Sequence, residues 1–150
     1  LHLLRIDHGA RVAATVARHM VVQPHREGGQ AQYIQQPLQQ NTDAHCLSDT
    51  IAWVLEHLAT AIDVDALAER SCQSRRSFDR HFREITGSSP KQWILHQRIL
   101  RAQELLETTD LPIDGLAQTV GFANGVALRP HFRRIVGVSP QAYRITFRTT

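Results

Sequence analysis

The residues most able to do chemistry in this 150-residue sequence are two cysteines, nine histidines and a cluster of arginines. No histidine lies four residues from another and no Cys-x-x-Cys pair is present, so the spacing typical of a zinc site is absent. Cys46 and Cys72 each lie in an amphipathic helical pattern, which favours two buried, reduced thiols. Neither has the strained turn and neighbouring histidine of an activated nucleophile. We therefore expect no metal, no cofactor and no catalytic residue.

The arginines are concentrated in one stretch. Between Ser74 and Arg101 there are seven basic residues and only two acidic ones, Asp79 and Glu84. Residues 62–150 hold thirteen Lys/Arg against nine Asp/Glu, a net charge of +4, whereas residues 1–61 hold four against five, a net charge of −1. Such a cluster is typical either of a solvated surface or of a nucleic-acid contact. The elements that carry the arginines must decide between these alternatives.

An internal repeat indicates how those elements are arranged. Segment 64–68 (VDALA) recurs as 113–117 (IDGLA), 49 residues later. Segment 81–83 (HFR) recurs as 131–133, now 50 residues later. The change in offset predicts one additional residue in the turn of the second copy. We interpret the pattern as one helical unit that occurs twice.

Each copy is expected to form a helix, a short turn and a second helix. In the first copy, Ser74 suits the N-cap of the second helix, because its hydroxyl oxygen can accept a backbone N–H. Phe78, Phe82 and Ile85 follow the i, i+4, i+7 spacing of a stripe that faces the core. The arginines of this helix then lie on its opposite side. Gly87 is placed to end the helix in the left-handed conformation.

A long helix is expected to join the two units. Pro90 follows the capping residue Ser89 at the first helical turn, where its missing N–H costs nothing. From there the pattern remains helical to about Glu107, with apolar residues on more than one side. This distribution indicates a connector that packs against two partners, and the fold class expected is all-α.

The N-terminal third of the chain has a different character. Residues 46–62 have the pattern of an amphipathic helix, whereas residues 23–42 are rich in Gln, Pro and Gly and are typical of a linker. Residues 9–22 are compatible with one more helix, separate from the main core. No apolar run approaches the roughly 20 residues of a membrane span, and no signal peptide opens the chain. We expect a cytoplasmic location and no membrane partner.

These elements suit the major groove of DNA. The groove is roughly 12 Å wide and admits one helix, and arginine can pair bidentately with guanine O6 and N7. A connector of about 18 residues is roughly 27 Å long at about 1.5 Å per residue. It can hold the second helices of the two units near the roughly 34 Å spacing of successive major grooves. We call these two helices, which would contact the bases, the reading helices. Those helices are expected at about residues 74–86 and 124–136.

From about Asp43 to Arg148 the sequence resembles the DNA-binding domain of the AraC/XylS transcription regulators. The most specific stretches are RILRAQELLE at 98–107, VGF at 120–122, HFRR at 131–134 and GVSPQAYR at 137–144. The resemblance implies a DNA-binding domain over 43–150, with helix-turn-helix units at about 46–88 and 111–148 and a linker helix at about 90–107. It also implies sequence-specific binding of double-stranded promoter or operator DNA, regulation of transcription, and RNA polymerase as a partner.

The first 42 residues carry a second resemblance. Residues 12–22 and 24–32 look like the end of a DJ-1/PfpI-like domain, which precedes the DNA-binding part in one subgroup of these regulators. Residues 1–42 are therefore expected to be the tail helix and linker of such a domain. Two other interpretations remain: a fragment of a DJ-1/PfpI-like hydrolase or amidotransferase, and a helical protein-interaction domain without DNA affinity.

The resemblance also implies a set of DNA contacts. In the first unit these are Arg75, Arg76, Asp79, Arg80 and Arg83, and in the second unit Asn124, Val126, Arg129 and Arg133. The candidates for phosphate contacts, or for plain solubility, are Lys91, Arg98, Arg101, Arg144 and Arg148. Asp79 could accept a hydrogen bond from cytosine N4 or orient a neighbouring arginine. For each of these residues the alternative is a solvated side chain without a base contact, and His81 and His131 are expected to be structural.

Pro130 departs from the pattern, because family members commonly have arginine at its place. Inside a helix, proline removes one N–H bond and clashes with the carbonyl four residues back, at a cost of about 3 kcal/mol. We therefore expect the second reading helix to start late or to be kinked. We also expect Arg76 and Arg80 to dominate base discrimination, with Arg129 and Arg133 contributing mostly phosphate affinity.

Overall fold

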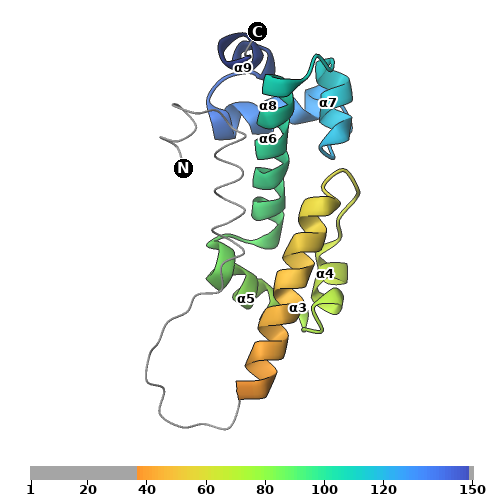
Figure 1. Ribbon diagram of the computed structural model, residues 1–150, viewed down its shortest axis with the longest axis vertical. Coiled ribbons are helices and arrows are strands. Elements are labelled where there is room, and N and C mark those ends of the chain that lie inside the picture. Colours follow the sequence, from red (N-terminus) through yellow and green to blue (C-terminus); the bar gives the residue numbers. More distant parts are fainter. Residues whose placement is uncertain (1–36, 149–150) are drawn as a thin grey trace.

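The computed structural model describes residues 37–148, and every regular element in this range is a helix. In chain order they are α3 (Pro37–Glu56), α4 (Val64–Arg70), α5 (Arg75–Thr86), α6 (Pro90–Thr108), α7 (Ile113–Thr119), α8 (Gly125–Val136) and α9 (Pro140–Phe147). The expected all-α fold is confirmed. Figure 1 shows α6 as the long element between a group formed by α3, α4 and α5 and a group formed by α7, α8 and α9. The helix expected near residues 9–22 lies outside the described residues.

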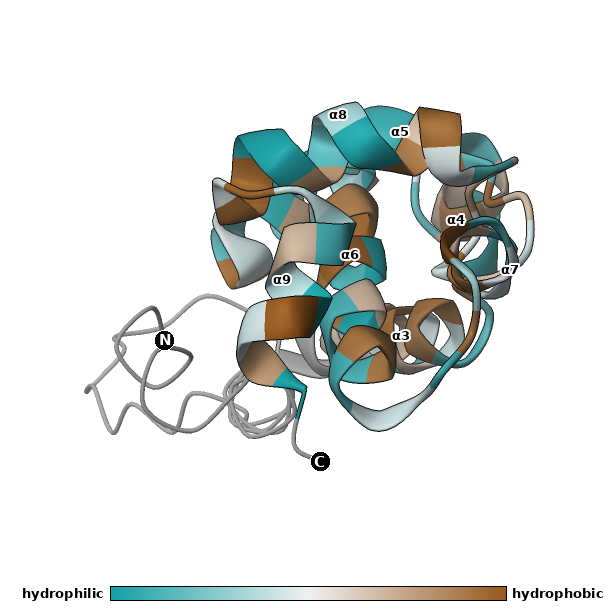
Figure 2. Cartoon of the chain, turned by 90° about the horizontal axis from the view of Figure 1, so that it is seen from above, coloured by the Kyte–Doolittle hydropathy of each residue, from teal (hydrophilic) through white to brown (hydrophobic). Residues whose placement is uncertain are grey.

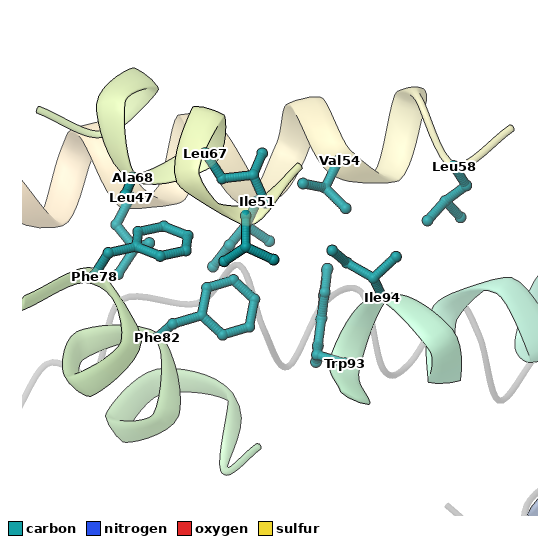
Figure 3. Packing of buried hydrophobic residues seen from close by; sticks show 11 residues of the cluster. Leu47, Ile51, Val54, Leu58, Leu67, Ala68, Phe78, Phe82, Trp93 and Ile94 are labelled. Carbon is teal, nitrogen blue, oxygen red and sulfur yellow. The ribbon is translucent and has the colours of Figure 1, made fainter. Parts of the chain in front are cut away.

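The first hydrophobic cluster is built by α3, α4, α5 and the beginning of α6. Phe78 and Phe82 of α5 are fully buried, as the spacing along this helix predicts. The ring of Phe82 meets the ring of Trp93 edge-on, with centroids 5.5 Å apart. Figure 3 shows both rings pointing toward the apolar side of α3, on which Ile51 lies. This packing fixes the orientation of α5 around its own axis.

A second, separate cluster is built by the rest of α6 with α7, α8 and α9. Phe132 of α8 and Tyr143 of α9 are fully buried and meet edge-on, with ring centroids 5.6 Å apart. The Tyr143 hydroxyl donates to Glu107 Oε1 at 2.6 Å, which ties α9 to the end of α6. Because α6 contributes Trp93 to the first cluster and Ile99 to the second, the expected connector with two partners is confirmed.

The boundaries of the first described helix differ from the prediction. The linker expected over 23–42 does not extend that far, because α3 already begins at Pro37. The helix expected over 46–62 ends at Glu56. Beyond it the chain must reverse to start α4, whose N-cap Asp63 accepts from the backbone N–H of Asp65. The apolar pattern in the sequence continues through this turn because Leu58 and Ile62 still pack on the core.

Two expectations of burial were wrong. Ile85, placed on the core stripe of α5, is 47% exposed and lies in the last turn of the helix. It lines a surface hollow together with Ala44 and Leu47. Cys72, expected in a buried helical position, is exposed and lies in the turn after α4 with a positive φ of 56°. Cys46 is half-buried.

The turns inside the two units have the lengths that the repeat predicts. Four residues separate α4 from α5 and five separate α7 from α8, so the additional residue of the second copy is in its turn. Cys72 and Gly121 occupy equivalent places, both with positive φ. At Gly121 a Cβ would lie 2.2 Å from the Leu58 carbonyl oxygen and 2.7 Å from Arg98 Nε. Glycine is required there both by conformation and by close approach.

Candidate nucleic-acid interface

The two reading helices have matching ends. Ser74 caps α5 by accepting from the Ser77 N–H, and Asn124 caps α8 by accepting from the Ala127 N–H. Each helix has 12 residues and ends at a glycine in the left-handed conformation. The bounds expected at about 74–86 and 124–136 are therefore confirmed. Because both helices are held by buried aromatic residues, their outer faces have defined orientations.

The reading helices lie at opposite ends of α6 but on one side of the molecule. Figure 1 separates α5 and α8 along the long axis, at the two ends of the connector. Figure 2, seen along that axis, shows α5 and α8 in line on the same side, largely in the colours of hydrophilic residues. One surface of the chain therefore presents both helices in the same direction.

Arg75 and Asp79 form an ion pair with each other. Arg75 Nη1 donates to Asp65 Oδ1 of α4 at 2.7 Å, and its Nε donates to Asp79 Oδ2 at 3.1 Å. These hydrogen bonds raise the pKa of Arg75 above its usual value. Of the two roles expected for Asp79, the geometry favours orienting Arg75 over meeting a cytosine. Arg75 in turn holds the start of α5 against α4.

The other arginines of α5 are open to solvent. Arg76, Arg80 and Arg83 are exposed on the side opposite Phe78 and Phe82, as the helical spacing predicts. Within residues 37–148 none of these three arginines forms an ion pair. Their guanidinium groups can therefore turn toward a polyanion without breaking an internal contact. His81 hydrogen-bonds with Gln73 through Nδ1 at 2.9 Å, which accords with a structural role.

A hydrogen bond from a backbone N–H joins the start of α8 to α7, whereas an arginine side chain joins the start of α5 to α4. The Gly125 N–H donates to Asp114 Oδ1 of α7 at 2.7 Å. Asp114 and Gly125 are the repeat equivalents of Asp65 and Arg75, so the same link between helices is made with different donors. A Cβ on Gly125 would lie 2.8 Å from that carboxylate oxygen and 3.7 Å from the guanidinium of Arg129. The matched aspartates in the repeat were the signal for this link, which sequence reasoning missed.

The outer face of α8 differs in kind from that of α5. Arg129 and Arg133 are exposed as expected, and Val126 is 69% exposed. Pro130 does not delay the start of α8. Like α5, this helix has 12 residues and begins at the equivalent position of the repeat, so the expected late start was wrong. The carbonyl that loses its partner is that of Val126, which lies on the solvent side, where water can replace the bond. His131 stacks on Phe122, as a structural residue would.

Arg98, a candidate for a phosphate contact or for solubility, makes hydrogen bonds inside the protein. Its Nε donates to the Leu58 carbonyl at 3.0 Å and its Nη2 to the Thr60 carbonyl at 2.8 Å. Burial lowers the pKa of this guanidinium below its usual value. Because Gly121 packs directly against it, Arg98 joins the loop before α4, the connector and the turn of the second unit.

The remaining candidates for phosphate contacts differ in whether their side chains already bind other groups of the protein. Lys91 is exposed and Arg101 is paired with Glu104 at 2.6 Å. Arg144 donates from Nη2 to the Leu111 carbonyl at 2.5 Å, and Arg148 pairs with Asp110. Arg144 and Arg148 thus hold the loop before α7 as Arg98 holds the loop before α4. Lys91 is the candidate that this arrangement leaves most available.

Among residues 37–148, no group of three or more His, Cys, Asp or Glu side chains is placed to hold a metal ion. In the same range no helix has both the length and the apolar character needed to cross a membrane.

Comparison with known proteins decides the family. The profile of a helix-turn-helix domain matches residues 67–145. The regulatory protein SoxS of Escherichia coli K12 is 32% identical over 98 residues, which cover 65% of this chain and 92% of SoxS. The DNA-binding domain of AdpA, solved in complex with a target DNA, is 53% identical over 68% of this chain and 92% of its own, with a TM-score of 0.66.

The chain belongs to the AraC family of helix-turn-helix transcription regulators. An AraC-type domain from Chromobacterium violaceum has the same fold at 23% identity, with a TM-score of 0.63 over 72% of this chain and 93% of its own. The family member ArgR of Pseudomonas aeruginosa is 29% identical over 144 residues, which are 96% of this chain but 44% of ArgR. The chain thus spans less than half the length of this relative.

Proposed function

We propose that this chain binds double-stranded DNA sequence-specifically, with α5 and α8 in successive major grooves, as the DNA-binding part of a bacterial cytoplasmic transcription regulator. The observation that carries the proposal is the pair of outward-facing helices on one side of a single rigid connector. Arg76, Arg80 and Arg83, which are exposed and form no ion pair within residues 37–148, supply donors for guanine edges. The 53% identity to the AdpA domain, whose structure holds a target DNA, supports the same interface here.

Similarity in the N-terminal segment indicates that the chain is part of a larger regulator. ArgR and GbdR of Pseudomonas aeruginosa each align over 96% of this chain, so the similarity extends well upstream of residue 43. We infer that the residues upstream of α3 are the tail helix and linker of a preceding DJ-1/PfpI-like domain, and that the DNA-binding domain, expected from about residue 43, already begins with α3 at Pro37. RNA polymerase is the further partner that a transcription regulator requires.

Catalysis is not part of the proposal. Loss of solvent around Cys46 and the nearby thiol of Cys72 both raise the Cys46 pKa, which favours the thiol over the reactive thiolate. Cys72 lies in the turn between α4 and α5, and its place in the repeat is that of Gly121. A hydrolase or amidotransferase activity therefore has no supporting arrangement in the described residues.

The direct test is binding to a pool of random duplexes, measured by gel shift and by fluorescence anisotropy at several salt concentrations. We expect a monomer to select a defined sequence, with log affinity falling by about 0.9 per log salt for each phosphate neutralised. The double variant Arg76→Ala/Arg80→Ala should lose the selected sequence. Arg70→Ala, which removes an exposed arginine of α4 that lies outside the predicted contacts, is the matched control. Failure to select any duplex, or affinity independent of salt, contradicts the proposal.

A further inference from the structure

The repeat places apolar residues in α8 where α5 has arginines. With the offset of 50 residues that relates the two reading helices, Arg76 corresponds to Val126 and Arg80 to Pro130. All four side chains are exposed, and Val126 is 69% exposed. The two units therefore present different chemistry at the same positions of one scaffold.

Val126 and Pro130 form one small surface. They are four residues apart on a helix, so they are neighbours on its outer face. Gly125, just before Val126, is buried against Asp114 of α7. The guanidinium of Arg129 lies beside this buried glycine, and that of Arg134 is within hydrogen-bond distance of His131. This pair is in the N-terminal half of the helix, the part that meets base edges when such a helix enters the major groove.

Only one feature of the major groove suits such a surface. Guanine, adenine and cytosine present hydrogen-bonding groups there, whereas thymine also presents its C5 methyl group. The side chains of Val126 and Pro130 have no donor or acceptor, and Pro130 has no backbone N–H either. Scattered exposed apolar residues are ordinary on protein surfaces. Here, however, the exposed Arg129 and Arg133 are close to the pair along the helix, and α8 lies on the same side of the molecule as α5 (Figure 2).

We propose that Val126 and Pro130 contact thymine methyl groups, so that the DNA site is asymmetric, with guanines facing α5 and thymines facing α8. The inference rests on the proposed DNA binding and specifies the class of sequence that is bound. It makes Val126 a specificity-determining residue, and it assigns a recognition role to the proline that interrupts the α8 hydrogen-bond ladder.

The experiment uses the duplex that the full chain selects from random sequences, and replaces each thymine singly by deoxyuridine. This change removes only the C5 methyl group. At one or two positions in the half facing α8 we expect the affinity to fall about four-fold, the effect of leaving one methyl-sized group unburied. In the half facing α5 the same replacement should have no effect.

Two variants assign the effect to the residue. Val126→Ala should bind the thymine and deoxyuridine duplexes equally, whereas the control Ile145→Ala, which truncates an exposed residue of α9, should keep the four-fold difference. A wild-type chain indifferent to every replacement overturns the inference, as does undiminished discrimination in both Val126→Ala and Pro130→Ala. Both results leave the proposed function intact, because that function is contradicted by failure to select any duplex or by an affinity independent of salt.

Discussion

The arginines of this chain divide according to their partners. Arg75 is held by two aspartates, and Arg98 is bound to two loop carbonyls. Arg76 and Arg80 have no internal partner in the described residues, so they can reach DNA without losing an ion pair. Spacing alone placed all of these side chains outside the core, and it could not separate the paired from the unpaired. That distinction depends on Asp65 and on the loop after α3, which only the folded chain brings near.

The first prediction compares base discrimination by the two reading helices. Changing Arg76 or Arg80 to Ala should cost about 1–3 kcal/mol at single base positions, because a bidentate guanine contact is lost. Changing Arg129 or Arg133 to Ala should weaken all sequences alike and lower the salt slope by about one. Affinities across operator variants measure both effects. Equal or greater loss of specificity from the α8 variants would rule out this asymmetry.

The second prediction compares two glycines that share a positive φ but differ in how closely other atoms approach them. Gly121 and Gly137 both have positive φ, but a Cβ meets Leu58 and Arg98 only at Gly121 and nothing within 4 Å at Gly137. Gly137→Ala should therefore cost only the strain of the left-handed conformation, roughly 1–2 kcal/mol. Gly121→Ala should cost more, because it also disrupts Arg98 hydrogen bonds worth about 1.5–3 kcal/mol each. Denaturant unfolding of the two variants measures the difference, and equal losses would show that Arg98 can move aside.

At the scale of the elements, the repeat predicted more than periodicity did. It gave both reading helices their bounds and placed the additional residue in the second turn. The apolar periodicity failed at the end of α5, where Ile85 fits the apolar stripe but is 47% exposed. It also failed at Cys72, since the pattern continued into a turn with positive φ. A local pattern reports which face is apolar, whereas tertiary packing decides where each helix stops.

The third prediction concerns the equivalent aromatic residues that orient the reading helices. Phe82 and Phe132 are fully buried, each in its own cluster and each edge-on to an aromatic residue of the next helix. Replacing either by Ala should lower the free energy of unfolding by on the order of 3–5 kcal/mol, through lost burial and a residual cavity. Thermal melts of both variants measure the effect. An unchanged midpoint in either variant would mean that its helix does not pack as described.

At the scale of the whole molecule, α6 links the two units because one helix belongs to both cores. Its first turn supplies Trp93 to one cluster, and its later turns supply Ile99 and Leu106 to the other. The Arg98 side chain adds bonds from the middle of α6 to the loop before α4. Neither unit can rotate about the connector without exposing apolar surface. The reading helices should therefore have one fixed separation and one fixed relative orientation.

The last prediction follows from this fixed separation. Inserting about 5 bp between the two halves of the selected duplex moves one half to the opposite face of the DNA, since a helical turn is about 10.5 bp. Inserting about 10 bp restores the face but lengthens the separation by roughly 34 Å. A flexibly tethered pair of units would recover affinity with the longer insertion. With both units built on α6, we expect neither insertion to restore footprinting protection of the second half. The affinity should fall in both cases to that of a duplex carrying the α5 half alone, and recovery at about 10 bp would show that the connector bends or that two chains bind.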